Sequence, residues 1–131
     1  MTQATTTSAA ARNPLFSALI GLASLAVLLQ GVWAGMFIRE GKQDNSTWVE
    51  VHARGADVAI VLAVIAVVVA IVKLRHRRDL LVGSIAFAVL LVVEAFIGGL
   101  IGGDNALEVV HFPLAMALLA LAVWLPMRSR R

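Results

Sequence analysis

Two histidines lie at the start of long apolar segments of this chain. His52 precedes an apolar run that ends at Lys73, and His111 lies in the run EVVHFPLAMALLALAVWL, residues 108–125. Imidazole gains little from lipid, so each ring needs a metal, a polar partner or an interfacial position. Paired histidines on facing helices of a bundle ligate haem iron from both sides. We therefore predict that His52 and His111 hold the iron of one non-covalent haem b.

The alternative for both histidines is an interfacial role, in which the rings bond to water or to lipid headgroups. The third histidine, His76, lies among cations in KLRHRRD (73–79) and is interpreted as a solvated residue. Met36 and Met116 are potential thioether ligands, but methionine in an apolar helix usually fills space. The sequence thus contains one pair of candidate iron ligands.

Small residues near the predicted ligands would admit a flat macrocycle between helices. Gly35 and Gly99 are the cofactor-site candidates among them, and the full set is Gly31, Ala34, Gly35, Gly98, Gly99, Gly102 and Gly103. Several of these glycines are four residues apart, which also fits ordinary close packing of membrane helices. That alternative is compatible with a haem site.

Two arginines are candidates for binding the haem propionates. Arg39 ends the first apolar segment, and Arg54 follows His52 by two residues. Either guanidinium could neutralise a carboxylate through a bidentate contact. Arg54 can instead pair with Glu50 and Asp57, which lie at helical spacing from it.

Three carboxylates, those of Glu50, Glu94 and Glu108, are candidates for assisting chemistry at the haem. Glu94 lies inside an apolar segment, where a charge costs roughly 2.5 to 3.5 kcal/mol on insertion scales, so it should face the bundle interior. It is either a proton site or a partner of a histidine N–H. The alternative is an interhelical hydrogen bond to Gln30 or to a hydroxyl group.

Four apolar segments must position these residues. The chain has 131 residues, of which 60% are hydrophobic, and a mean hydropathy of +0.90. Crossing a bilayer takes about 20 residues of helix, and the segments that qualify are 15–38, 52–73, 80–103 and 106–127. The predicted fold is all-α, an integral membrane four-helix bundle over residues 15–127. Cysteine is absent, which excludes disulfides, thiolate metal sites and covalent haem attachment.

The basic residues predict the topology. They gather in KLRHRRD (73–79), in RSRR (128–131) and at Arg12, whereas the other two loops are mixed or acidic. By the positive-inside rule both termini face the cytoplasm of a bacterial inner membrane. We predict a disordered cytoplasmic segment at 1–14 and a cytoplasmic basic tail at 128–131. The net charge of +3 is interpreted as topology and not as nucleic-acid binding.

An internal repeat relates the two halves of the bundle. With an offset of 64 residues, LLQGVWAG (28–35) aligns with VVEAFIGG (92–99), so that Gln30 meets Glu94. The second and fourth segments each open with a capping pattern followed by a histidine, Thr47-x-x-Glu50 and Asn105-x-x-Glu108. The sequence therefore predicts a tandem repeat of two helix hairpins. A pseudo-two-fold axis along the membrane normal would then bring the two histidine-bearing helices face to face.

Several of these motifs together resemble one half of a haem A synthase. The motifs are GMFIREG (35–41), EVH (50–52), VVEAFIGGLIGG (92–103) and EVVHFPLAMALL (108–119), and the resemblance covers residues 20–127. It implies a four-helix unit that holds haem near the outer face through His52 and His111, with Arg39 on the propionate side. The chain also resembles small four-helix bacterial membrane proteins of unassigned function.

Three functions follow as hypotheses. The first is a cytochrome b-like protein that transfers electrons or handles haem. The second is a half-size haem-modifying oxidoreductase that works as a homo-oligomer. The third is a cofactor-free scaffold or a small subunit of a larger membrane complex. In each case the lipid bilayer is the common partner.

Overall fold

The protein consists of helices. In a computed structural model, residues 12–39, 47–101 and 105–131 are described, so the predictions on residues 1–11, Gly102 and Gly103 lie outside this part. The described residues form α1 (Pro14–Arg39), α2 (Thr47–Lys73), α3 (Arg78–Leu100), a 3-10 turn η2 (Asn105–Leu107) and α4 (Glu108–Ser129). Four of these helices are long and apolar enough to cross a membrane. This confirms the prediction of an all-α protein with four such helices.

The helix ends follow from local chemistry. α1 begins with Pro14, and the side-chain oxygen of Asn13 accepts the amide N–H of Phe16 at 3.0 Å, which caps the first turn. The predicted cap at Asn105 is wrong, because Asn105 is the first residue of a 3-10 turn and Leu107 occupies the N-cap of α4 without a side-chain hydrogen bond. α4 also runs through Ser129, so the first half of the predicted tail is helical.

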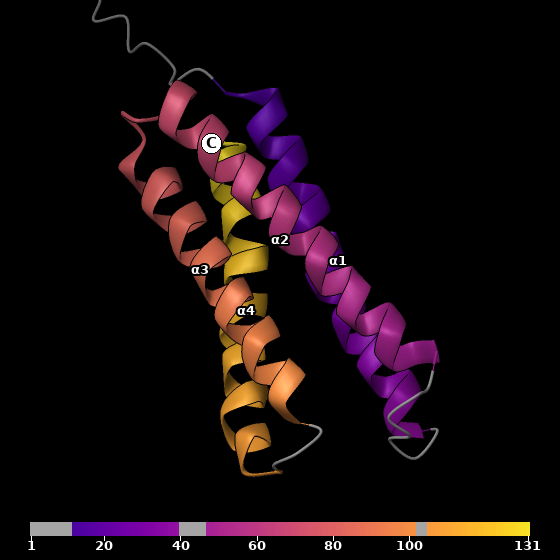
Figure 1. The fold of residues 1–131 in the computed structure, drawn as a ribbon. Coiled ribbons are helices and arrows are strands. Elements are labelled where there is room, and N and C mark those ends of the chain that lie inside the picture. The colour runs from indigo at the N-terminus through magenta and orange to yellow at the C-terminus, as the bar shows by residue number, and fades with distance from the viewer. Residues whose placement is uncertain (1–11, 40–46, 102–104) are drawn as a thin grey trace, which may run out of the picture.

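The helices pack in a ring in chain order. α1 packs on α2, α2 on α3, α3 on α4, and α4 on α1 (Figure 1). In such a ring α2 and α4 lie across the bundle from one another. The two predicted iron ligands therefore come from opposite helices.

The buried core occupies one end of the bundle. We call this the terminal end, because α1 and α3 begin there and α2 and α4 end there. The buried positions lie between Phe16 and Val27 on α1, Ala59 and Ala70 on α2, Leu80 and Glu94 on α3, and Leu118 and Ser129 on α4. At the opposite end, here called the histidine end, no described helical residue is buried beyond Val27 on α1 or Glu94 on α3, or before Ala59 on α2 or Leu118 on α4.

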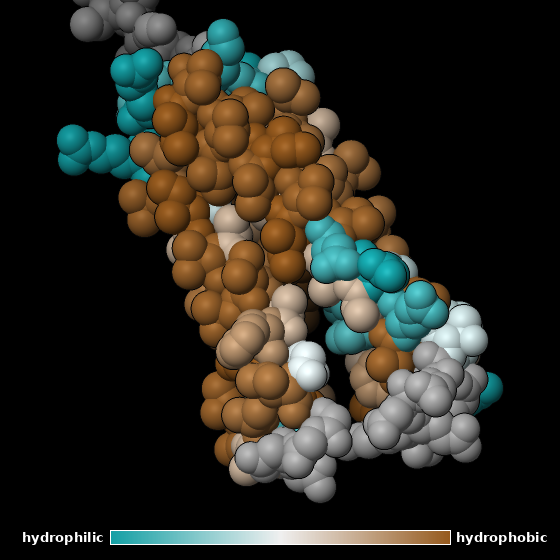
Figure 2. Space-filling model, in the orientation of Figure 1, coloured by the Kyte–Doolittle hydropathy of each residue, from teal (hydrophilic) through white to brown (hydrophobic). Residues whose placement is uncertain are grey.

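Side-chain size explains the difference between the two ends. At the terminal end, α2 presents Ala59, Ala63, Ala66 and Ala70, which are fully buried and allow close helix approach. Phe16 and Phe87 fill the remaining space. Toward the histidine end the α1–α2 and α3–α4 hairpins diverge (Figure 1), and Figure 2 shows a hollow between them. The bundle is therefore packed at the terminal end and open at the histidine end.

Buried positions recur at constant offsets along the chain. On α2 and α4 they are 59, 63, 66 and 70 against 118, 122, 125 and 129, an offset of 59. On α1 and α3, positions 16, 20, 23, 24 and 27 correspond to 80, 84, 87, 88 and 91, an offset of 64. Equivalent helices of the two hairpins thus bury their side chains in the same register.

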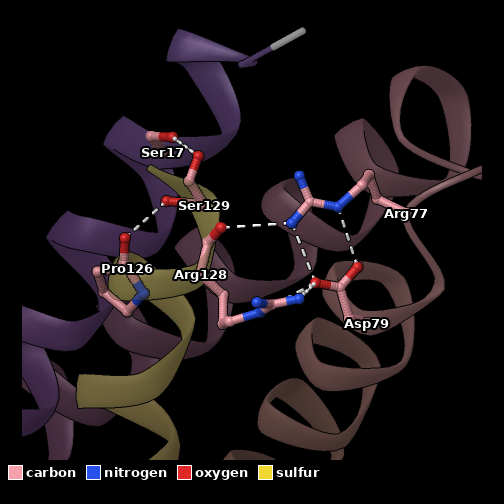
Figure 3. Close-up of polar contacts among 6 residues, drawn as sticks. All are labelled: Ser17, Arg77, Asp79, Pro126, Arg128 and Ser129. Carbon is pink, nitrogen blue, oxygen red and sulfur yellow. Dashed lines mark hydrogen bonds and ion pairs between the residues drawn. The ribbon is translucent and has the colours of Figure 1, made fainter. Parts of the chain in front are cut away.

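A polar cluster closes the terminal end (Figure 3). Arg77 donates to both carboxylate oxygens of Asp79 at 3.1 and 3.0 Å, and Arg128 donates to Asp79 Oδ2 at 3.1 and 2.7 Å. The hydrogen bond to Asp79 raises the pKa of Arg77 above its ordinary value. Ser17 donates to the backbone oxygen of Ser129 at 3.5 Å. These contacts join the end of α4 to the starts of α3 and α1.

Candidate haem site

His52 lies on the inward face of α2. It precedes Ala59 by seven residues, two helical turns, so it continues the buried alanine stripe into the open half of the bundle. Its Nδ1 lies 3.2 Å from the backbone oxygen of Gln30. A neutral ring that donates from Nδ1 to this carbonyl oxygen carries its lone pair on Nε2. Phe37 packs edge-on against the ring, with centroids 5.4 Å apart at 81°.

The side chain of Gln30 anchors the same turn of α2. With its oxygen turned toward donors, the amide accepts from Ala56 N–H at 3.0 Å. The amide nitrogen lies 2.9 Å from the backbone oxygen of His52 and 3.0 Å from Nδ1. Donation to the backbone oxygen leaves Nδ1 free to donate to the Gln30 carbonyl. Gln30 therefore fixes both the backbone and the ring of His52.

His111 has the equivalent place on α4. It precedes Leu118 by seven residues and so continues the inward stripe of α4. Its Nδ1 lies 3.0 Å from Oε1 of Glu94 on α3. Both atoms are buried, and they are not aligned for a hydrogen bond. This contact, and not the alternative bond from Glu94 to Gln30, is present within the described residues.

Gly98 provides the wall against which the His111 ring packs. A Cβ atom at position 98 would lie 3.1 Å from Cε1 of the ring, closer than an ordinary contact. Gly98 follows Glu94 by one helical turn, so both residues face His111. The sequence contained the signal for this contact, because Gly98 shares the face of Glu94, but Gly98 was not among the predicted site residues.

The predicted glycines Gly35 and Gly99 line open space. A Cβ atom at either position, or at Gly31, would meet nothing within 4 Å. Gly31 lies 14 residues after Ser17 and therefore on the same side of α1. Ser17 contacts α4, so this side of α1 faces the bundle. Close helix packing therefore does not account for these three glycines in this structure.

The predicted arginines lie apart from the rings. Arg39 is exposed at the end of α1. Arg54 is two residues from His52, about 200° around the helix, and pairs with Asp57 at 3.8 Å. The alternative interpretation of Arg54, an ion pair along its own helix, is the contact that the structure contains.

The candidate carboxylates differ in their relation to the histidines. Glu94 contacts His111, and Glu108 lies about one turn before His111 on the same helix. Glu50, like Arg54, lies on the side of α2 away from His52. Met116 has 72% of its surface exposed, and His76 is exposed too, so neither joins the site.

The two rings have the features that haem ligation needs. Each is half-buried on an inward face, and each Nδ1 lies beside an oxygen of the neighbouring helix in its own hairpin. Within the described residues neither Nε2 atom has a hydrogen bond. The residues present therefore fit a haem held between α2 and α4.

This fit is the basis for any assignment of function. Among the described residues, no cluster of three or more His, Cys, Asp or Glu side chains could hold a metal ion directly. A haem held by His52 and His111 would not require such a cluster, because the macrocycle would supply the other iron ligands. Comparison of the chain with protein-family models, with curated proteins and with solved structures found no match.

Proposed function

We propose that this chain is a membrane-embedded haem-binding protein of the b type, serving electron transfer or haem handling. His52 and His111 would be its two iron ligands. The observation that carries the proposal is the similar surroundings of the two rings. Each ring continues the line of buried positions on its helix, and each has an oxygen beside Nδ1. When bound, the haem would supply one-electron redox chemistry.

The neighbouring residues would orient the ligands. An oxygen that accepts from Nδ1–H fixes the tautomer and the plane of an imidazole, so that Nε2 carries the lone pair that a metal needs. The Gln30 carbonyl would have this role for His52, and the Glu94 carboxyl group, 3.0 Å from Nδ1, would have it for His111. The packed terminal end would keep the helices in register while the open end receives the cofactor.

The same proposal includes the tandem repeat and its orientation. The constant offsets of buried positions support two equivalent hairpins related by an axis along the bundle. The cations of the terminal end support a cytoplasmic location for that end, and they are Lys73, Arg75, Arg77, Arg78, Arg128, Arg130 and Arg131. The histidine end would then face the outer side of a bacterial inner membrane.

A spectrum of the purified protein tests the assignment. The chain is expressed, extracted in mild detergent and reduced with dithionite, and a sharp visible α band is expected. His52→Ala and His111→Ala should each abolish the band. The matched control His76→Ala, which changes an exposed histidine outside the site, should retain it. Absence of the band in a well-folded, haem-supplied wild-type protein would refute the proposal.

A half-size haem-modifying enzyme is the second candidate function. It is favoured by the buried Glu94 carboxylate, whose two oxygens have no aligned hydrogen bond within the described part of the chain. Such a group can hold or accept a proton beside a bound substrate. Turnover of added haem would distinguish this function from electron transfer, and Glu94→Gln should abolish turnover while the α band persists.

A further inference from the structure

A charged stripe lies on the outward face of α2. Glu50, Arg54 and Asp57 follow one another at intervals of four and three residues, so they share one side of the helix. That side is opposite to the face that carries His52 and Ala59. The side chains of Arg54 and Asp57 are 75% and 66% exposed. In Figure 2 a hydrophilic patch over α2 interrupts an otherwise apolar surface.

The depth of the stripe makes its exposure unusual. Trp33 of α1 packs on Gly55, and α1 continues from Trp33 to Arg39, about 9 Å farther along the bundle. Asp57 lies 16 residues from Lys73, about 24 Å, which is less than the roughly 30 Å of a hydrocarbon core. The charges of Arg54 and Asp57 thus lie at or inside the outer boundary of the hydrocarbon region.

Arg54 and Asp57 on α2 do not form a hydrogen bond with one another. The guanidinium of Arg54 and the carboxylate of Asp57 are 3.8 Å apart, beyond hydrogen-bond distance. Charged side chains inside a membrane are stabilised by facing protein or water, and exposure to lipid is costly. The stripe therefore requires a partner in the plane of the membrane.

We propose that the partner is a second copy of this chain, with α2 packed against α2 about a two-fold axis along the membrane normal. In such a parallel pair the same residue of each copy lies at the same depth in the membrane. Each Arg54 therefore has one acid of the other copy about one turn above it and one about one turn below it. The arginine of one copy therefore reaches Asp57 or Glu50 of the other. The sequence of charges is self-complementary, as an isologous interface requires.

The surface next to the charges suits the same contact. Toward the terminal end the stripe continues as three exposed valines, Val61, Val64 and Val68. Beside it, α1 and α2 form a shallow groove of about 550 Å³ whose lining includes Glu50, Arg54 and Trp33. Side chains of a second α2 can enter this groove. The inference does not depend on haem binding.

A cross-linking experiment tests the interface directly. The chain has no cysteine, so a single introduced thiol reports on one position. Val61→Cys on the proposed face should give a disulfide-linked dimer when membranes are oxidised. Val89→Cys on α3 is the matched control, because both valines are exposed, 57% and 55%, and lie at about equal distance from the terminal end. Equal cross-linking at the two positions would overturn the inference.

Charge reversal then identifies the occupant of the face. In the Val61→Cys background, Arg54→Glu makes the face entirely acidic, and Glu50→Arg combined with Asp57→Arg makes it entirely basic. Each variant alone should lose cross-linked dimer by about tenfold. Co-expression of the two, with different tags, should restore a mixed dimer, which also shows that both variants fold. If either variant alone still dimerises, or if the mixture does not, another protein or lipid covers this face and the proposal is wrong.

Discussion

Glu94 and His111 approach one another to 3.0 Å between Oε1 and Nδ1, although they lie on different helices. The equivalent contact in the other hairpin joins His52 to a neutral backbone carbonyl, that of Gln30, at 3.2 Å. The two imidazoles therefore have partners of different chemistry, a carboxyl group for His111 and a peptide carbonyl for His52. An anionic partner makes an imidazole a more basic ligand than a neutral one does.

Replacement of the Glu94 carboxyl group by an amide should raise the midpoint potential of a bound haem. Glu94→Gln keeps the shape of the side chain but weakens electron donation through His111, so the oxidised iron loses stability. The expected shift is on the order of 60 mV, equivalent to about 1.4 kcal/mol for one electron. Potentiometric titration of the α band measures it. Glu50→Gln removes a carboxyl group on the side of α2 away from His52, and an equal shift there would contradict the contact-based explanation.

A methyl group at position 98 should displace the ring of His111. The Cβ atom of Gly98→Ala would lie 3.1 Å from the imidazole, so haem affinity should fall by about tenfold. Gly21→Ala is the matched control in the packed half of α1, where nothing lies within 4 Å of an added Cβ atom. Haem titration of both variants provides the comparison. Similar affinities for the two would show that the ring does not depend on Gly98.

Core packing at the terminal end should dominate stability. Phe87→Ala removes a ring with 0% exposure and should lower the free energy of unfolding by about 3 kcal/mol. Phe96→Ala, on the same helix but 68% exposed, should change it by less than about 0.5 kcal/mol. Denaturation in detergent followed by circular dichroism measures both. Equal losses would mean that the stabilising core does not lie at the terminal end.

The carboxylate of Asp79 should contribute a smaller, salt-sensitive stabilisation. Asp79→Asn removes an acceptor shared by Arg77 and Arg128, whose side chains are 16% and 38% exposed. Because water screens part of the interaction, the expected loss is about 1 kcal/mol, diminishing as salt is added. Arg75→Gln, an exposed cation in the same loop, serves as control and should have little effect. A loss that does not depend on salt would argue against an ionic contribution.

The sequence predicted the helices well, because each apolar segment is longer than the bilayer requires. The ends were less predictable. Asn105 and Glu108 fit a capping pattern, yet Asn105 begins a 3-10 turn, and α4 starts only at Glu108. The helicity of Arg128 also escaped prediction, because its bond to Asp79 joins positions far apart in the chain.

The candidate site was predictable in composition and less so in detail. The histidines and Glu94 were evident as polar residues in apolar segments. The structure adds which oxygen faces which Nδ1, and this depends on helix rotation, which spacing within one helix does not fix. For Arg54 two interpretations were open, a contact with a haem propionate and an ion pair along its own helix. The structure contains the ion pair with Asp57. Arg54 is two residues from His52 along the helix, and this spacing turns its side chain away from His52.

The confinement of buried side chains to the terminal end has a practical consequence for protein engineering. Residues that keep the chain folded and residues that would bind a cofactor belong to separate portions of the same four helices. Libraries randomised around Gly31, Gly35 and Gly99 could therefore alter ligand preference with little loss of expression. Such substitutions would leave the packed core at the terminal end unchanged.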